Sequence, residues 1–245
     1  MRFDCLTLFP EMMKSVLGES IIGRAVAAGI LDIRYTNIRD FAENKHNRVD
    51  DYPYGGGEGM VMQAMPIYRA WQSVTDGGKK KAKVVYLSPQ GKVFNQKMAE
   101  SLAKEEHLIL LCGHYEGVDE RVIEEIVDEE ISMGDFVLTG GEIPAMALID
   151  AVSRLVPGVL SSEDAYSNES HYDGLLEHGQ YTRPPECLGR AVPEVLLSGH
   201  HKNITEWKRK ESIRRTALKR PDMIKNAPLS DKERRWAEEL IGEVK

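Results

Sequence analysis

The 245-residue sequence predicts an α/β protein: a parallel sheet with helices on both faces, followed by a small C-terminal helical domain. Three observations support this. Short apolar, strand-like runs alternate with helical patterns through residues 1–160. Two glycine-rich loops each follow a buried strand, which suits a small ligand at the carboxyl edge of a sheet. The region after residue 175 is helical and locally basic, although the net charge of the chain is −7.

Apolar runs of strand length define the sheet. They predict strands at residues 3–8, 31–35, 83–87 and 107–112. Residues 39–59 are polar and glycine-rich and are expected to form a long loop.

Helical patterns separate these strands. They predict helices at residues 10–29, 67–74, 96–104, 121–127 and 142–156. Pro10 opens the first helix and Gly29 ends it, while Pro144 fits the first turn of the last one. Pro157 and Gly158 stop that helix. In the C-terminal region, residues 230–244 begin with Ser-Asp-Lys-Glu, which is typical of a helix start.

Composition excludes several classes of protein. No apolar run is long enough to span a bilayer, so no membrane association is expected. The segment from Met1 to Leu6 contains an acid and no small-residue cleavage site, unlike a signal peptide. Three scattered cysteines give neither metal-ligand spacing nor a disulfide framework. A cytoplasmic protein is therefore expected.

The two glycine-rich loops are the strongest signals in the chain. The first, residues 113–121, reads Gly-His-Tyr-Glu-Gly-Val-Asp-Glu-Arg, and the second, residues 132–142, reads Ser-Met-Gly-Asp-Phe-Val-Leu-Thr-Gly-Gly-Glu. Neither is a dinucleotide-binding fingerprint, because no Gly-x-Gly-x-x-Gly opens a helix after a strand. A third glycine cluster, in residues 51–62, lacks the Gly-Lys-Ser/Thr of a phosphate-binding loop.

Both loops resemble those of the bacterial tRNA (guanine-N1)-methyltransferases, a family of the knotted SPOUT class, and the resemblance extends from residue 1 to about residue 228. It implies a deep trefoil knot in the parallel sheet. It also implies methyl transfer from S-adenosyl-L-methionine to N1 of guanine 37 of tRNA, beside the anticodon and preceded by guanine 36. A homodimer with its active site at the subunit interface is implied as well. Magnesium assists catalysis in the family, and no ligand constellation in this sequence locates it.

The resemblance places the methyl donor between the two loops, with the end of the strand at residues 83–87 as a third wall. The implied cofactor-binding residues are Leu87, Ser88, Pro89, Gly113, Tyr115, Glu116, Ser132, Met133, Gly134, Asp135, Phe136, Val137, Leu138, Gly140, Gly141 and Pro144. The physical requirement is a narrow slot in which main-chain groups reach the edge of a base.

The third glycine cluster is similar to the family's loop beside the target guanosine. Small residues there would let a flipped nucleotide pass close to the main chain. The implied tRNA contacts in this region are Asp50, Gly55, Gly56, Gly57, Gly59 and Met60.

Methyl transfer to N1 of guanine requires removal of the N1 proton and stabilisation of the charge that builds on O6. The family's base is an acid a few residues before Gly-Leu-Leu, which here is Gly174-Leu175-Leu176. Ungapped counting selects Glu169, where the family has Asp, and Asp164 is the competitor. Arg154 is the implied cation.

The sequence changes character after the last predicted helix of the first domain. Residues 161–175 hold acids but no basic residue and little to bury, so we expect a flexible linker between a domain at 1–160 and a helical tRNA-binding domain at 176–245. Residues 200–225 contain nine basic and three acidic residues. The candidate tRNA contacts of this domain are Arg183, Ser198, Lys208, Arg214 and Arg215.

Two alternatives are also compatible with the sequence. One is a knotted methyltransferase that acts on another RNA. The other is a non-catalytic RNA-binding relative, which the Asp-to-Glu difference at residue 169 keeps open.

Overall fold

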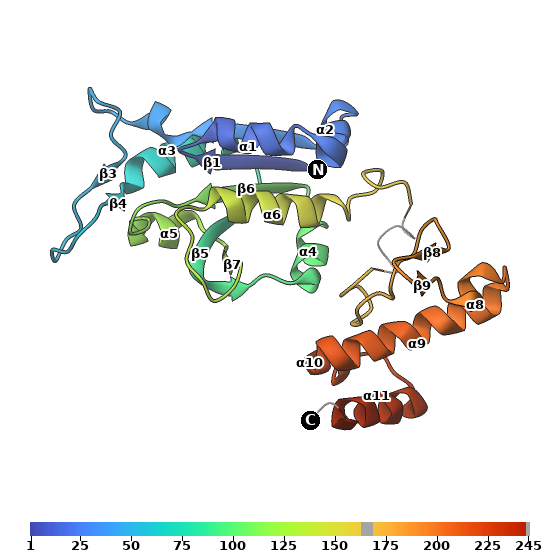
Figure 1. The fold of residues 1–245 in the computed structure, drawn as a ribbon. Helices are drawn as coiled ribbons and strands as arrows, with labels where there is room; N and C mark the ends of the chain where they lie inside the picture. Colours follow the sequence, from blue (N-terminus) through green and yellow to red (C-terminus); the bar gives the residue numbers. More distant parts are fainter. Residues whose placement is uncertain (163–168, 244–245) are drawn as a thin grey trace. The chain divides into compact units, whose positions relative to one another are not determined.

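A computed structural model describes residues 1–162 and 169–243 of the chain (Figure 1). The chain divides into two compact units, Met1–Ser161 (unit 1) and Ser162–Lys245 (unit 2).

Unit 1 is built on a five-stranded sheet in which every neighbouring pair is parallel. Its strands, in spatial order, are β2 (Asp32–Asn37), β1 (Arg2–Thr7), β6 (His107–Cys112), β5 (Lys83–Val93) and β7 (Glu129–Ser132). Parallel strands end at the same edge of a sheet, so the loops after β5, β6 and β7 are brought together although they are distant in sequence.

Both faces of this sheet are buried. In β6, Leu108, Leu110 and Cys112 belong to one apolar cluster, and the alternate residues Ile109 and Leu111 belong to the other. The first cluster includes residues of helices α1 (Pro10–Leu17), α2 (Ser20–Ala27), α4 (Gln96–Leu102) and α6 (Glu142–Ser153). The second includes residues of α3 (Ala64–Thr75), α5 (Glu120–Ile126) and the 3₁₀ helix η1 (Ile38–Phe41). The continuous apolar run of β6 is therefore explained by burial on both sides.

The helix predicted at residues 10–29 is two helices, α1 and α2. Gly18 caps the first helix, and Ser20 begins the second with a positive φ of 54°. A Cβ on Gly23 would lie 2.1 Å from the carbonyl oxygen of Gly18, so the second helix packs against the end of the first at a point where only glycine fits. The uninterrupted apolar pattern concealed this break.

Strand β5 continues six residues beyond the predicted end, to Val93. Leu87 and Lys92 both pair with Ile131 of β7, so the strand is irregular between them. Most of its residues after Ser88 are exposed, which is why the apolar pattern ended early.

Unit 2 consists mainly of helices. Its elements are β8 (Glu186–Cys187), β9 (Arg190–Ala191), α8 (Glu194–Leu197), α9 (His201–Lys219), α10 (Pro221–Ile224) and α11 (Asp231–Glu243). Its small core contains Leu175, Ile213, Ala217, Ile224, Ala227 and Ala237. Leu218 of α9 is 37% exposed and is not part of this core.

Among residues 1–162 and 169–243, none of the helices combines the length and the apolar character that crossing a membrane requires.

The start of α11 is the predicted capping box. The amide of Ser230 donates to Glu233 Oε2 at 2.8 Å, and the amide of Glu233 lies 3.4 Å from Ser230 Oγ. Arg209 Nε of α9 also donates to Glu233 Oε1 at 2.9 Å. The Arg209 hydrogen bond, together with those from Ser230, lowers the pKa of Glu233 from 4.5 to about 2. Glu233 therefore joins α9 to α11 only while it is ionised.

We predict that Glu233→Gln lowers the free energy of unfolding of unit 2 by about 1 kcal/mol at pH 7, because it removes a capping carboxylate and an ionic hydrogen bond. Since the folded state lowers this pKa, the stabilisation is present above pH 4.5 and is lost as the pH falls towards 2. Urea unfolding of the full chain at several pH values measures it. Glu238→Gln, an exposed position on the same helix, is the control. A constant difference between Glu233→Gln and wild type at every pH would contradict the prediction.

Candidate active site

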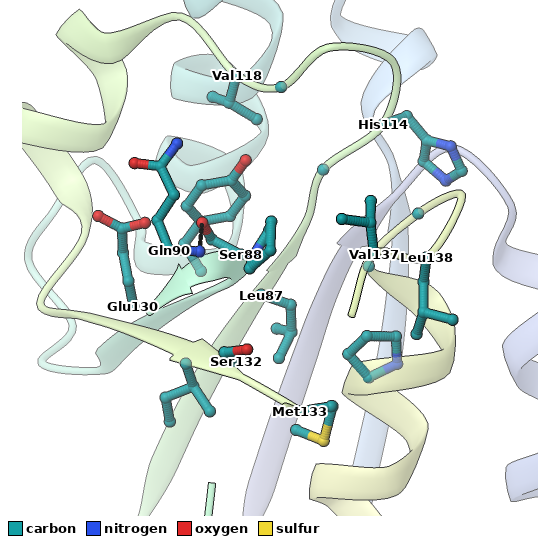
Figure 2. A pocket seen from close by; sticks show the side chains of 18 of the residues that line it. Leu87, Ser88, Gln90, His114, Val118, Glu130, Ser132, Met133, Val137 and Leu138 are labelled. Carbon is teal, nitrogen blue, oxygen red and sulfur yellow. Dashed lines mark hydrogen bonds between the residues drawn. The ribbon is translucent and has the colours of Figure 1, made fainter. Parts of the chain in front are cut away.

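A cavity of about 400 Å³ lies at the carboxyl edge of the sheet in unit 1 (Figure 2). It is bounded by the segment after Tyr86 in β5, by the loop after β6 and by the loop after β7. In Figure 2, Ser88, Gln90 and Glu130 lie on one side of it and Val137 and Leu138 on the other. Its volume is within the usual range for small-molecule sites.

The sequence identified most of this lining. Of the residues implied as cofactor-binding, those that line the cavity are Leu87, Ser88, Pro89, Gly113, Tyr115, Glu116, Ser132, Met133, Phe136, Val137, Leu138, Gly140, Gly141 and Pro144. Gly134 and Asp135 are not among the lining residues. Gly134 instead shapes the turn: its amide and its carbonyl both bond Ser132 Oγ, and its φ of 143° suits only glycine.

Other lining residues were missed. They are Tyr86, Gln90, His114, Gly117, Val118, Glu120, Ile123, Glu130, Ile131 and Thr139. Tyr86, Glu130 and Ile131 lie in β5 and β7, near the carboxyl edge that was expected to hold the ligand. No sequence pattern marks these three residues, because the side of the sheet on which a strand residue lies depends on which strands are its neighbours.

Close backbone contacts hold the two loops together. The amide of Gly141 donates to the carbonyl of Gly113 at 2.9 Å, and His114 forms an isolated antiparallel bridge with Gly140. A Cβ on Gly141 would lie 2.7 Å from Cys112 Cα, and one on Gly113 would lie 2.9 Å from the Tyr86 hydroxyl. A side chain at Gly141 would push the second loop away from the end of β6, and one at Gly113 would displace the Tyr86 ring, so both glycines are needed for this packing.

The apolar run Phe136-Val137-Leu138 is not a strand. It bends around the cavity, and Val137 is 81% exposed. The buried strand before this loop is β7, which ends at Ser132.

The cavity is acidic. Glu116, Glu120 and Glu130 line it, and no lysine or arginine of the described part of the chain does so. Burial, followed by the charges of Glu130 and Glu120, raises the pKa of Tyr86 to about 12. An acidic lining favours a cationic ligand over one that carries phosphates.

The third glycine cluster adjoins the cavity. It lies between β3 (Asp50–Asp51) and β4 (Val61–Met62), which pair with each other. The amide of Glu116 donates to the carbonyl of Met60, and a Cβ on Gly59 would lie 2.5 Å from Glu116 Oε1. The cluster therefore meets the first loop at the edge of the cavity.

The remaining residues of this cluster that the resemblance implied as tRNA contacts lie in β3 and in the loop after it. Asp50 is half-buried in β3. Gly55, Gly56, Gly57 and Gly59 all have positive φ, from 78° to 129°.

The predicted catalytic pair is divided between the units. Arg154 follows the last residue of α6 in unit 1, where its amide donates to the carbonyl of Asp150. Glu169 belongs to unit 2 and is half-buried. Its competitor Asp164 lies outside the described residues.

The segment that carries Glu169 is folded onto unit 2. The amide of His171 donates to the carbonyl of Leu175 at 2.8 Å, and the amide of Glu177 donates to Ser170 Oγ at 3.0 Å. Leu175 itself is buried in the core of the unit.

In unit 2, the predicted tRNA contacts lie on several elements. Lys208, Arg214 and Arg215 are on α9, Ser198 follows α8, and Arg183 precedes β8. Arg214 pairs with Glu211 on the same helix at 2.7 Å. Unit 2 also contains an aromatic group: the rings of His178 and Tyr181 are 6.0 and 6.2 Å from that of Trp207 on α9.

Within the ranges 1–162 and 169–243, no group of three or more His, Cys, Asp or Glu residues has the arrangement of a metal site.

Comparison with known proteins identifies the family to which this chain belongs. Residues 1–226 match the family described as tRNA (Guanine-1)-methyltransferase TrmD. A tRNA (guanine-N(1)-)-methyltransferase of Ruminiclostridium cellulolyticum is 60% identical over 228 residues, which is 93% of this chain and 98% of that protein. The enzymes of the same name from Alkaliphilus oremlandii and Bacillus subtilis are 56% and 52% identical over 98% of this chain and 98% of each relative. The chain therefore belongs to the tRNA (guanine-1)-methyltransferase TrmD family.

Proposed function

We propose that the protein transfers a methyl group from S-adenosyl-L-methionine to N1 of guanine 37 in tRNA. The observation that carries the proposal is the family match over residues 1–226, which includes the whole lining of the acidic cavity. Relatives of 52–60% identity are named for methylation of guanine N1 in tRNA. Because tRNA is the substrate, we place the activity in the cytoplasm.

The acidic cavity supports a sulfonium methyl donor. Adenosylmethionine carries positive charge on its sulfur and its amino group, which Glu116, Glu120 and Glu130 would attract. The backbone groups exposed by Gly113, Gly140 and Gly141 can reach the edge of its adenine. The proposed fold of this region includes the trefoil knot of the family.

The proposed chemistry requires a proton acceptor for N1 and a cation near O6. Glu169 is the proposed general base, a role that typically contributes ~10²–10⁴-fold to the rate. Arg154 is the proposed cation, since a guanidinium can donate two hydrogen bonds to a developing oxyanion. Magnesium is a proposed assistant of this step, with no ligands assigned.

The proposed target site is the glycine cluster beside Glu116. Its glycines leave room for an extruded nucleotide next to the main chain, and Asp50 has a carboxylate that can accept hydrogen bonds from a guanine edge. On unit 2, the basic residues of α9 would neutralise phosphates of the tRNA.

An exposed apolar surface supports the proposed homodimer. Phe9, Met12 and Val16 are 46%, 43% and 56% exposed, and their spacing puts them on one face of α1. Helix α6, which contacts α1, adds the exposed Ile143. A second copy of the chain covering this surface would lie beside the cavity, because the Phe9 ring packs on His114 of its lining.

The proposal predicts that the full chain transfers tritium from labelled S-adenosyl-L-methionine to an unmodified tRNA transcript with guanines at positions 36 and 37. A transcript with adenine at position 37 should remain unlabelled. Label at another base would favour a different target, and binding of tRNA without transfer would favour a non-catalytic relative.

Glu169→Gln is predicted to abolish transfer while changing the affinity for S-adenosyl-L-methionine by less than about twofold, because it removes the base but not the cavity. Calorimetry of cofactor binding accompanies the transfer assay. Asp164→Asn is the matched variant and should retain activity. The opposite result for the two variants would assign the base to Asp164.

A composite site predicts complementation between subunits. Glu169→Gln lacks the base, and Met133→Trp fills the cavity. Mixed and re-equilibrated, the two inactive variants should recover about a quarter of wild-type activity, because half of the dimers are mixed and one of their two sites is intact. Activity that stays at the level of the separate variants would show that each chain completes its own site.

A further inference from the structure

A buried carboxylate lies where the two cavity loops meet. Glu142 is the first residue of α6 and is 2% exposed. Its Oε1 accepts a hydrogen bond from Thr7 Oγ1 at 2.5 Å, and its Oε2 lies 2.6 Å from His114 Nε2. One side chain therefore joins the end of β1, the loop after β6 and the start of α6.

The space around Glu142 is fitted to this arrangement. A Cβ on Gly140 would lie 2.2 Å from His114 Cε1 and 2.8 Å from Glu142 Oε2. Thr7 Oγ1 also accepts from the amide of Phe9 at 2.9 Å, and the Phe9 ring packs edge-on against His114, with centroids 4.9 Å apart. Each partner of the carboxylate is thus held by a second contact.

A buried carboxylate is a costly way to join two loops, since its desolvation must be offset by every hydrogen bond it makes. An apolar side chain would fill the same volume at lower cost, but it would not fix the direction of the His114 ring. His114 and Gly140 line the cavity, whereas Thr7 and Glu142 do not.

We propose that Glu142 is a positioning residue: through His114 and Thr7 it holds the two glycine loops at the separation that the methyl donor requires. This inference rests on the proposed function. It assigns to Glu142 a role in cofactor affinity, with no contact to the cofactor and no part in proton transfer.

The same sheet provides a matched control. At the start of β6, His107 Nε2 lies 2.6 Å from Asp4 Oδ2, and Asp4 is 1% exposed. This is also a buried His–carboxylate pair, in which Arg2 is a further partner of Asp4, but Asp4 and His107 lie near the amino ends of β1 and β6, away from the cavity. If both pairs contribute only to stability, neither Glu142→Gln nor Asp4→Asn should change the affinity for the cofactor more than the other does.

The test compares Glu142→Gln with Asp4→Asn in the full chain. For Glu142→Gln we expect the KM for S-adenosyl-L-methionine and the Kd for S-adenosylhomocysteine to rise about tenfold, the cost of one ionic hydrogen bond. The kcat at saturating cofactor and the KM for tRNA should stay within about twofold of wild type. Asp4→Asn should lower the melting temperature without changing either cofactor constant.

Equal cofactor constants for Glu142→Gln and wild type would overturn the inference, as would an equal rise in both variants. Thr7→Val, which removes only the hydroxyl, covers the case in which Glu142→Gln does not fold, and it should raise the same KM by about threefold. A wild-type protein that does not bind S-adenosyl-L-methionine would instead overturn the proposed function itself.

Discussion

The hydrogen bond from the Gly141 amide to the Gly113 carbonyl joins the start of α6 to the end of β6. A Cβ on Gly141 would be 2.7 Å from the Cys112 backbone, so the helix begins as close to the strand as main chain allows. This contact closes one side of the cavity at the start of α6, the helix that ends at Arg154. The contact between the two glycines and the core packing of Ala145, Leu148, Ile149 and Val152 together hold the helix that carries Arg154.

Charge is divided between the units in a way that the net charge of −7 conceals. The cavity of unit 1 is lined by three glutamates, whereas α9 of unit 2 is predominantly basic. A sulfonium donor and a polyanionic RNA are substrates of opposite charge, and one surface could not attract both. With two separate units, each substrate can meet a surface of the opposite charge. Some of the basic residues of unit 2 have structural roles, as Arg209 does with Glu233, so the charge available to RNA is smaller than the sequence count.

The sequence predicted those elements whose burial is uniform. Strand β6 has the predicted bounds because both of its faces are covered and every residue from Leu108 to Cys112 is apolar or cysteine. The division between α1 and α2 was missed because it depends on a contact between Gly18 and Gly23. That contact does not change the spacing of the apolar residues from which the helix was predicted. Glu130 and Tyr86 were missed because they belong to strands, and a strand residue reveals its side of the sheet only when the neighbouring strands are known. The proposed knot rests on the family resemblance alone, because a knot is a property of the path of the whole chain and not of any local pattern.

In the proposed reaction, methyl transfer from a sulfonium is a single displacement, so the protein would contribute chiefly a proton acceptor and a fixed geometry. The acceptor is worth ~10²–10⁴-fold, and orientation can contribute more, but only when the reacting atoms are held close to their productive positions. Glycine lets the backbones of the two loops approach closely, but it also makes the loops more flexible. Such loops need restraint from elsewhere. The hydrogen bonds of Glu142 to Thr7 and His114 supply it from inside the fold, where water cannot compete for the carboxylate. The need for both close approach and rigidity thus explains why a buried acid lies beside glycines.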